Sequence, residues 1–223
     1  MKRVLLSWSS GKDSAWALHI LRQKPGYEIA GLLTTVNEEF DRVAMHGVRR
    51  ELLERQAAAV NLPLSVIPLP WPCSNEEYET LMAKACDDAI ASGIEAVAFG
   101  DLFLEDVRAY RERQLARTNL EPIFPLWGLP TRTLAEEMIL SGMKAMLTCV
   151  DTRKLDADFA GRTFDKSLLA ELPSKIDPCG ENGEFHSFAY AGPMFTHEVS
   201  VVRGETVVRD LFAFADLLPA KTA

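Results

Sequence analysis

A polar segment near the N-terminus has the residue types that bind a polyphosphate. Residues 7–14 read SWSSGKDS and separate an apolar segment from a helix-like one. Lys12 supplies a positive charge, and Gly11 can adopt a positive φ that opens room for a phosphate. Hydroxyl donors come from Ser9, Ser10 and Ser14. Backbone N–H groups at the start of a helix also bind anions, so we predict a phosphate site here. The alternative is a serine-rich turn that only caps the helix.

Asp13 is the member of this segment that repels a phosphate. A carboxylate beside a polyphosphate is tolerated when a divalent cation bridges the two, or when the side chain caps backbone N–H groups. We therefore expect Mg²⁺ at Asp13. The segment is not a Walker A loop, because that motif needs glycine in place of Leu6 and serine or threonine in place of Asp13.

Three further carboxylates are candidates for chemistry. Glu181 and Glu184 flank an Asn-Gly step. Two carboxylates on a flexible turn can bind an ammonium ion, a substrate amine or Mg²⁺, although an Asn-Gly step before a strand is also a common hairpin turn. Asp101 follows a buried-strand pattern at residues 96–99. There it can hold Mg²⁺ or a substrate, or cap the next helix.

A possible ion pair, Arg108 with Glu112, and a lone histidine, His46, each admit a functional and a structural interpretation. Arg108 and Glu112 are four residues apart on a predicted helix, which is the spacing of a surface ion pair. Arg108 can also bind a substrate carboxylate with two guanidinium nitrogens. His46 precedes a glycine in a predicted loop, where a lone histidine is either structural or a substrate contact.

The first 125 residues alternate short apolar runs with amphipathic ones, which predicts alternating strands and helices. The expected strands are residues 4–6, 29–36, 64–69, 96–99 and 122–124. The expected helices are residues 14–21, 48–60, 74–91 and 106–117. Ser74 and Glu77 form a capping-box pattern at the third helix. This alternation is typical of an α/β fold with a doubly wound, mostly parallel five-stranded sheet. In such a fold ligands bind beyond the carboxyl ends of the strands, where residues 7–14 and Asp101 fall.

The pattern changes after residue 125. A helix is expected at residues 134–140 and a strand at residues 145–150. Short strand patterns follow at residues 185–190, 199–202 and 206–208, with Arg203-Gly204 as the expected hairpin turn. We therefore expect a first domain of residues 1–125 and a smaller mixed α+β domain of residues 126–223.

The composition excludes several classes of protein. With 24 Lys and Arg against 32 Asp and Glu, the formal charge is -8, so the surface as a whole repels nucleic acid. No apolar run reaches the roughly 18 residues of a membrane span, and the N-terminus turns polar too early for a signal peptide. We expect a cytoplasmic protein whose partners include no nucleic acid and no membrane. The 4 cysteines and 4 histidines show no zinc-ligand spacing.

The N-terminal loop and a second motif together resemble a known family. SSGKDS at residues 9–14 resembles the SGGKDS pyrophosphate loop of the PP-loop ATP pyrophosphatases, with Ser10 in place of a glycine. CGENGEF at residues 179–185 resembles the CGEGGEF signature of the diphthine-ammonia ligase family, with Asn182 in place of a glycine. Further matches lie between the two motifs in the same order, at residues 45–46, 100–102, 108, 112, 125–127, 145–146 and 161–163. The chain is identified as a member of this family by a resemblance that spans residues 4–195.

The resemblance implies a Rossmann-like (HUP) fold and an amide ligase that uses ATP and Mg²⁺ and forms AMP and pyrophosphate. ATP would activate a carboxylate as an acyl-adenylate, and ammonia would then displace AMP. The implied acceptor is a diphthine-bearing elongation factor, held by the second domain while the first holds ATP. Catalytic roles fall to Lys12, Asp101, Glu181 and Glu184. ATP contacts fall to residues 9–14 and, at the adenine, to Thr34 and Thr35, which otherwise only end a strand. Substrate contacts fall to His46, Arg108, Glu112, Gly183 and His186.

Several alternatives stay open. Asn182 and His186 lie in the expected acceptor pocket, so the acceptor can instead be a small carboxylic acid. An ATP-binding sensor without turnover would not require the carboxylates of residues 181–184. A tRNA-modifying enzyme of the same superfamily is disfavoured by the net charge. Sulfur transfer would need a second thiol beside Cys179, so we expect Cys179 to be a packed core residue. The sequence does not indicate the oligomeric state.

Overall fold

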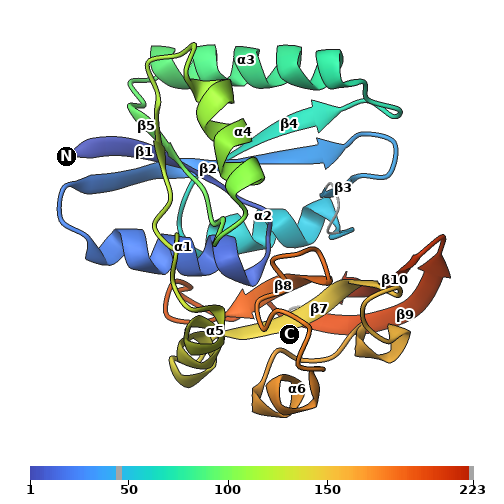
Figure 1. Cartoon of the computed structure of the whole chain (residues 1–223). Helices are drawn as coiled ribbons and strands as arrows, with labels where there is room; N and C mark the ends of the chain where they lie inside the picture. The colour runs from blue at the N-terminus through green and yellow to red at the C-terminus, as the bar shows by residue number, and fades with distance from the viewer. Residues whose placement is uncertain (44–46, 221–223) are drawn as a thin grey trace.

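The computed structural model describes residues 1–43 and 47–220 and contains two β-sheets with helices between and around them (Figure 1). The N-terminal half builds the first sheet. Its strands are β1 (Lys2–Ser7), β2 (Tyr27–Asn37), β3 (Arg42–Val43), β4 (Leu64–Leu69), β5 (Ala96–Ala98) and β6 (Glu121–Ile123). Its helices are α1 (Lys12–Gln23), α2 (Arg50–Ala59), α3 (Asn75–Ala91) and α4 (Glu105–Leu115). Within the described ranges, no helix is long and apolar enough to cross a membrane.

The first sheet has the predicted parallel arrangement. Its parallel strands run in the order β4-β2-β1-β5-β6, and β3 pairs in the antiparallel sense with the end of β2. Helices α1 and α2 lie on the face toward the second sheet, and α3 and α4 cover the opposite face (Figure 1). Parallel neighbours need crossover connections, which the helices provide. The predicted α/β fold is confirmed, with β3 as a sixth, two-residue strand that the sequence pattern did not show.

The second sheet is antiparallel and packs against the helices of the first. Its strands are β7 (Lys144–Asp151), β8 (Phe185–Ala191), β9 (Val201–Arg209) and β10 (Phe212–Pro219), in the order β8-β7-β10-β9. The accompanying helices are α5 (Thr131–Leu140), η1 (Ala157–Phe159) and α6 (Lys166–Glu171). Helix α1 contacts β8, and α2 contacts β10. One cluster of buried apolar side chains contains both Trp16 of α1 and Phe188 of β8, so the two sheets share a core.

The predicted turn at Arg203-Gly204 is wrong. Both residues lie inside β9, which runs through the two short strands that the sequence pattern separated. The register between β9 and β10 shifts beside Gly204, so this glycine marks a β-bulge instead of a turn. The hairpin turn lies at Asp210, which has a φ of 52°. Aspartate tolerates this left-handed conformation better than most residues do, and the turn was therefore hidden in an ordinary-looking sequence.

The connection between β1 and α1 contains a strained residue. Gly11 was expected to take the positive φ, but its φ is -82°, and Ser10 instead has a φ of 68°. The Ser10 carbonyl accepts hydrogen bonds from the Ala189 backbone N–H (3.0 Å) and from Gln56 Nε2 (2.9 Å), which hold this conformation. Ser10 is fully buried, and its hydroxyl has no hydrogen-bond partner among the described residues. The segment thus carries a backbone strain that a glycine would avoid.

We expect Ser10→Gly to stabilise the protein. A side chain in the left-handed region costs roughly 1–2 kcal/mol, and glycine removes that cost together with the buried hydroxyl. Ser10→Ala is the matched control, because it removes the hydroxyl but keeps the Cβ that causes the strain. Urea unfolding should give Ser10→Gly a midpoint above both the wild type and Ser10→Ala. Equal midpoints for the two variants would show that the strain contributes nothing.

Candidate active site

A cavity of about 670 Å³ lies at the carboxyl ends of β1, β2 and β5. It reaches between the first sheet and the helices α3 and α4, and the segment of residues 179–187 forms another part of its wall. The N-terminal segment and the end of β2 contribute Ser9, Lys12, Asp13, Ser14, Thr34 and Thr35. The end of β5 and the C-terminal half contribute Asp101, Glu181, Gly183 and His186. The fold therefore brings together ten of the predicted site residues from four distant segments.

Other predicted site residues lie outside this lining. Ser10, Gly11 and Glu184 are buried but do not line the cavity. Arg108 and Glu112 form an ion pair of 2.8 Å on α4. The Arg108 guanidinium lies 4.9 Å from the Phe124 ring centroid and 4.8 Å from that of Trp127, outside the cavity. His46 lies outside the described residues.

Lys12 is a buried charge at the centre of the site. Its side chain is 2% exposed, and its Nζ lies 2.8 Å from Asp13 Oδ2 and 3.0 Å from Asp13 Oδ1. The same Nζ donates a hydrogen bond to the Cys179 carbonyl. The rings of Phe164 and Phe185 lie 5.5 and 5.4 Å away. Burial opposes the ammonium charge, but the Asp13 carboxylate and other nearby groups outweigh it and raise the pKa of Lys12. Lys12 is thus held as a cation.

Hydroxyl groups partner the first backbone donors of α1, because the Gly11 N–H donates to Ser9 Oγ at 3.3 Å and the Lys12 N–H donates to Ser187 Oγ at 3.2 Å. Gly11 is the N-cap residue and makes no side-chain cap hydrogen bond. Ser14 Oγ donates to the Gly11 carbonyl at 3.0 Å and lies 3.2 Å from Ser9 Oγ, so two hydroxyls meet at the cavity wall. Gly100, at the end of β5, packs directly on the Asp13–Ser14 peptide. A Cβ at Gly100 would lie 3.0 Å from the Ser14 nitrogen. A glycine is therefore required for this close approach.

Two carboxylates face Asp13 from other elements. Glu181 Oε1 accepts hydrogen bonds from the backbone N–H groups of Leu102 (2.7 Å) and Phe103 (3.4 Å). Burial raises the pKa of Glu181 to about 7, and the nearby Asp13 and Asp101 contribute to this rise. Burial also raises the pKa of Asp101, whose Oδ2 lies 3.6 Å from Arg111 Nε. Since the pKa of Glu181 lies close to neutral pH, this group can take up and release a proton during a reaction.

Asp177 holds the turn that carries Glu181, and sequence reasoning missed it. Its Oδ1 accepts from the backbone N–H groups of Cys179 (2.9 Å) and Glu181 (3.2 Å), and its Oδ2 accepts from Thr131 Oγ1 (2.6 Å). Glu184 supports the same turn from behind, because its Oε1 accepts from the Asp177 N–H at 3.1 Å. An aspartate two residues before an N–H that it binds is an Asx-turn pattern, which was the available signal.

Cys179 and His186 are buried beside Lys12. Burial raises the pKa of the Cys179 thiol, whose Sγ donates to the Thr131 carbonyl at 3.5 Å. The thiol therefore stays protonated, which fits a packed residue and not a nucleophile. Burial, together with Lys12, lowers the pKa of His186 to about 4, so its imidazole is neutral at physiological pH. The next residue, Ser187, accepts a hydrogen bond from the Lys12 backbone N–H at 3.2 Å.

The carboxylates do not form a ready-made metal site. Within residues 1–43 and 47–220, no group of three or more His, Cys, Asp or Glu residues is placed to hold a metal ion. Both Asp13 oxygens lie within hydrogen-bond distance of Lys12 Nζ. Mg²⁺ is commonly held by one or two carboxylates together with substrate phosphates. The arrangement fits that mode of binding, with Asp13 as a ligand only if its pairing with Lys12 changes.

Comparison with known proteins assigns both halves of the chain. A family model described as diphthamide synthase N-terminal domain matches residues 1–121, and one described as diphthamide synthase C-terminal domain matches residues 130–218. A human protein named diphthine–ammonia ligase is 27% identical over 235 residues, spanning 96% of this chain and 88% of its own. Zebrafish (Danio rerio) diphthine–ammonia ligase is 27% identical over 237 residues, spanning 96% and 91%. Schizosaccharomyces pombe diphthine–ammonia ligase is 24% identical over 225 residues, spanning 92% and 37%. The chain belongs to the diphthamide synthase family and is a ligase enzyme of that family.

Proposed function

We propose that the protein is an ATP-dependent amide ligase that adenylates a carboxylate and transfers ammonia to it. The acceptor in this proposal is a diphthine-bearing elongation factor, in keeping with the names of the relatives. One observation carries the proposal: several functional groups line the same cavity. They are the buried ammonium of Lys12 at the N-terminus of α1 and the carboxylates of Asp101 and Glu181. Phosphate binding and proton transfer can therefore take place side by side.

The cavity suits ATP in one orientation. Phosphates fit at the start of α1, where backbone N–H groups, the helix dipole and Lys12 favour negative charge. Ser9 and Ser14 place two hydroxyl groups at this end, and these would exchange their present hydrogen bonds for bonds to phosphate. The adenine then lies toward Thr34 and Thr35, where apolar side chains such as Ile67 line the cavity between the sheet and α3.

The proposed reaction has two steps. An oxygen of the substrate carboxylate attacks the α-phosphorus, the bond from that phosphorus to the bridging oxygen breaks, and pyrophosphate leaves. Ammonia nitrogen then attacks the acyl carbon, the acyl–oxygen bond breaks, AMP leaves, and the nitrogen loses a proton. Lys12 and the N–H groups of α1 stabilise the charge that builds on pyrophosphate. Glu181, with its pKa near neutrality, accepts the proton.

Magnesium fits this proposal as a companion of the nucleotide. It would arrive with the phosphates and take at most one or two carboxylate ligands, among which Asp13 and Asp101 line the same cavity. It supplies charge neutralisation on the phosphate oxygens. The residues of this chain then orient the phosphates and exclude water from the acyl end.

The first test removes the Lys12 charge. Lys12→Met keeps an apolar stem in the buried site, and Lys24→Met, at an exposed position, is the matched control. With Mg²⁺, ATP, ammonium and diphthine-bearing elongation factor, Lys12→Met should form AMP about 10²–10³-fold more slowly, the usual cost of losing one such donor. The control should match the wild type.

The products of the same assay separate the alternatives. AMP with one new amide on the elongation factor supports the full proposal. AMP formation only with small carboxylic acids would replace the acceptor, and ATP recovered intact with every acceptor would indicate a nucleotide sensor. Equal rates for Lys12→Met and the wild type would defeat the proposed role of the loop.

Gly100→Ala should weaken nucleotide binding. The added Cβ would lie 3.0–3.1 Å from backbone atoms of the Asp13–Ser14 peptide, so the segment of residues 9–14 that we propose binds phosphate must shift. A misplacement of about 1 Å costs up to about 10²-fold in positioned interactions, and we expect a Kd for ATP at least about tenfold higher by calorimetry. Gly204→Ala is the control, since its Cβ would meet no atom closer than 3.4 Å. An unchanged Kd for Gly100→Ala would contradict the phosphate site.

The rate of amide formation should depend on the protonation of Glu181. Its pKa is raised to about 7, so the carboxylate form that accepts a proton is lost as the pH falls through 7. With neutral ammonia held at constant concentration, kcat/KM should fall below pH 7 and level off above it. Glu181→Gln should be slow and lack this inflection. His186, with its pKa near 4, should not titrate in this range. An unchanged inflection in Glu181→Gln would assign the proton transfer elsewhere.

A further inference from the structure

Two exposed aromatic side chains meet beside the cavity. Phe40, in the loop after β2, and Trp71, in the loop after β4, have ring centroids 5.8 Å apart in an edge-to-face arrangement. Phe40 is 50% exposed and Trp71 is 61% exposed. Aromatic residues are enriched at protein interfaces, where they bury much area at a low entropic cost. We call these two residues the aromatic pair.

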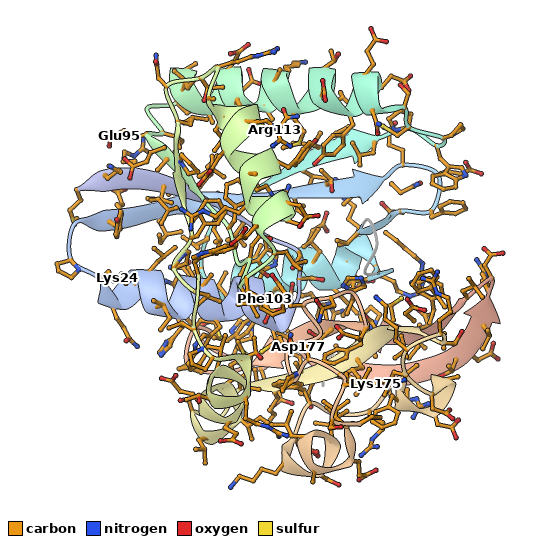
Figure 2. All side chains as sticks on the ribbon, in the orientation of Figure 1. Lys24, Glu95, Phe103, Arg113, Lys175 and Asp177 are labelled. Carbon is orange, nitrogen blue, oxygen red and sulfur yellow. The ribbon has the colours of Figure 1, made fainter. Side chains whose placement is uncertain are left out.

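The aromatic pair follows two strands whose carboxyl-terminal residues line the cavity. Thr35 of β2 and Leu69 of β4 line the cavity, and the loops that carry Phe40 and Trp71 follow these two strands. The Glu38 N–H donates to the Leu69 carbonyl at 3.0 Å, which ties the loops together. Figure 1 shows the ends of β2 and β4 side by side at the same edge of the first sheet. Figure 2 draws the side chains of the chain in the same orientation.

The surroundings of the aromatic pair are acidic. Glu38, Glu39 and Asp41 flank Phe40 in the sequence, and Glu76 follows Trp71 at the start of α3; all four are exposed. The nearest basic side chain in the sequence, Arg42, is turned to Asp216 Oδ1 at 2.9 Å and to the Gly47 carbonyl at 2.6 Å. Asp41 has a distant contact with Arg50 at 3.9 Å. We call Glu38, Glu39, Asp41 and Glu76 the acidic rim. Together with the aromatic pair they combine an apolar anchor with excess negative charge.

We propose that the aromatic pair and its acidic rim are the docking site for a basic segment of the protein that carries the acceptor carboxylate. An apolar or cationic side chain of that segment would pack on the exposed rings, and its Lys or Arg residues would pair with Glu38, Glu39 and Glu76. Docking there places the acceptor chain at the cavity mouth. This inference rests on the proposed function and gives it a macromolecular acceptor instead of a small carboxylic acid.

The charge argues against other occupants. An anionic membrane surface would be repelled by the carboxylates. A second copy of this chain would place the same acidic rim against itself, which is unfavourable for a symmetric contact. A basic protein segment satisfies both the rings and the carboxylates.

The test compares two rim variants with a matched control. Phe40→Ala/Trp71→Ala removes the rings, and Glu38→Lys/Glu39→Lys reverses the charge. Leu140→Ala/Val208→Ala is the control, because these side chains are 70% and 60% exposed on α5 and β9. The Kd for diphthine-bearing elongation factor, measured by calorimetry without ATP, should rise about tenfold or more in both rim variants. The KM for that acceptor should rise in parallel, with kcat and the Kd for ATP unchanged. The control should behave as the wild type.

Binding and turnover are measured separately so that the two proposals can fail separately. If the wild type binds the elongation factor but forms no AMP, the proposed reaction fails while the binding comparison still tests the rim. An unchanged Kd for the elongation factor in both rim variants would overturn the docking site. It would also be overturned if the ring variant lost only binding to phosphatidylserine vesicles, or only self-association in sedimentation.

Discussion

The buried charge of Lys12 is the constraint on which the rest of the site depends. An ammonium taken out of water is costly unless it is paired and hydrogen-bonded. Here the partners come from both ends of the chain, the Asp13 carboxylate and the Cys179 carbonyl. The segment of residues 9–14 therefore reaches its final form only when the turn of residues 177–184 is in place. Asp177 fixes that turn, so the geometry around Lys12 depends on residues more than 160 positions away.

A buried glutamine, Gln56, links the second sheet to the segment between β1 and α1 in the same way. Gln56 of α2 is fully buried, accepts from Trp8 Nε1 at 2.9 Å, and donates to the Ser10 and Ala189 carbonyls. One side chain thus satisfies the end of β1, the strained Ser10 peptide and strand β8 together. Removing the second sheet would take away the Ala189 N–H that donates to the Ser10 carbonyl and the Ala189 carbonyl that accepts from Gln56, so each of these buried groups would lose one partner. The antiparallel sheet is a wall of the site and a structural support for the loop.

Local patterns predicted the parts of the fold that are local. Alternating apolar runs gave β1, β2, β4 and β5, and the Ser74–Glu77 capping box is formed as expected. The position of Lys12, Asp13 and Asp101 followed from the rule that parallel strands end at one edge. Gln56 was missed because its partners Ser10 and Ala189 lie on distant segments, and a single sequence does not show such contacts. Asp177 was missed although it binds N–H groups only two and four residues away, a local pattern that the sequence does contain. The β9–β10 hairpin was misplaced because the glycine that suggested a turn occupies a bulge.

The negative charge of the cavity means that a polyphosphate can bind there only together with positive charge. Asp13, Asp101 and Glu181 line the space assigned to phosphates and acyl group, and burial with mutual repulsion raises the pKa of Glu181 and Asp101. A site in which carboxylates already repel one another receives a polyphosphate only with compensating positive charge. Protonation of Glu181 would remove one negative charge, and a cation bound to the phosphates would add positive charge. In the proposed reaction, release of pyrophosphate would reverse this balance, and the Glu181 carboxylate would then be available as a base for the attack of ammonia. Under the proposed function, the crowding of acidic groups would couple phosphate binding to proton transfer, which a neutral site would not do.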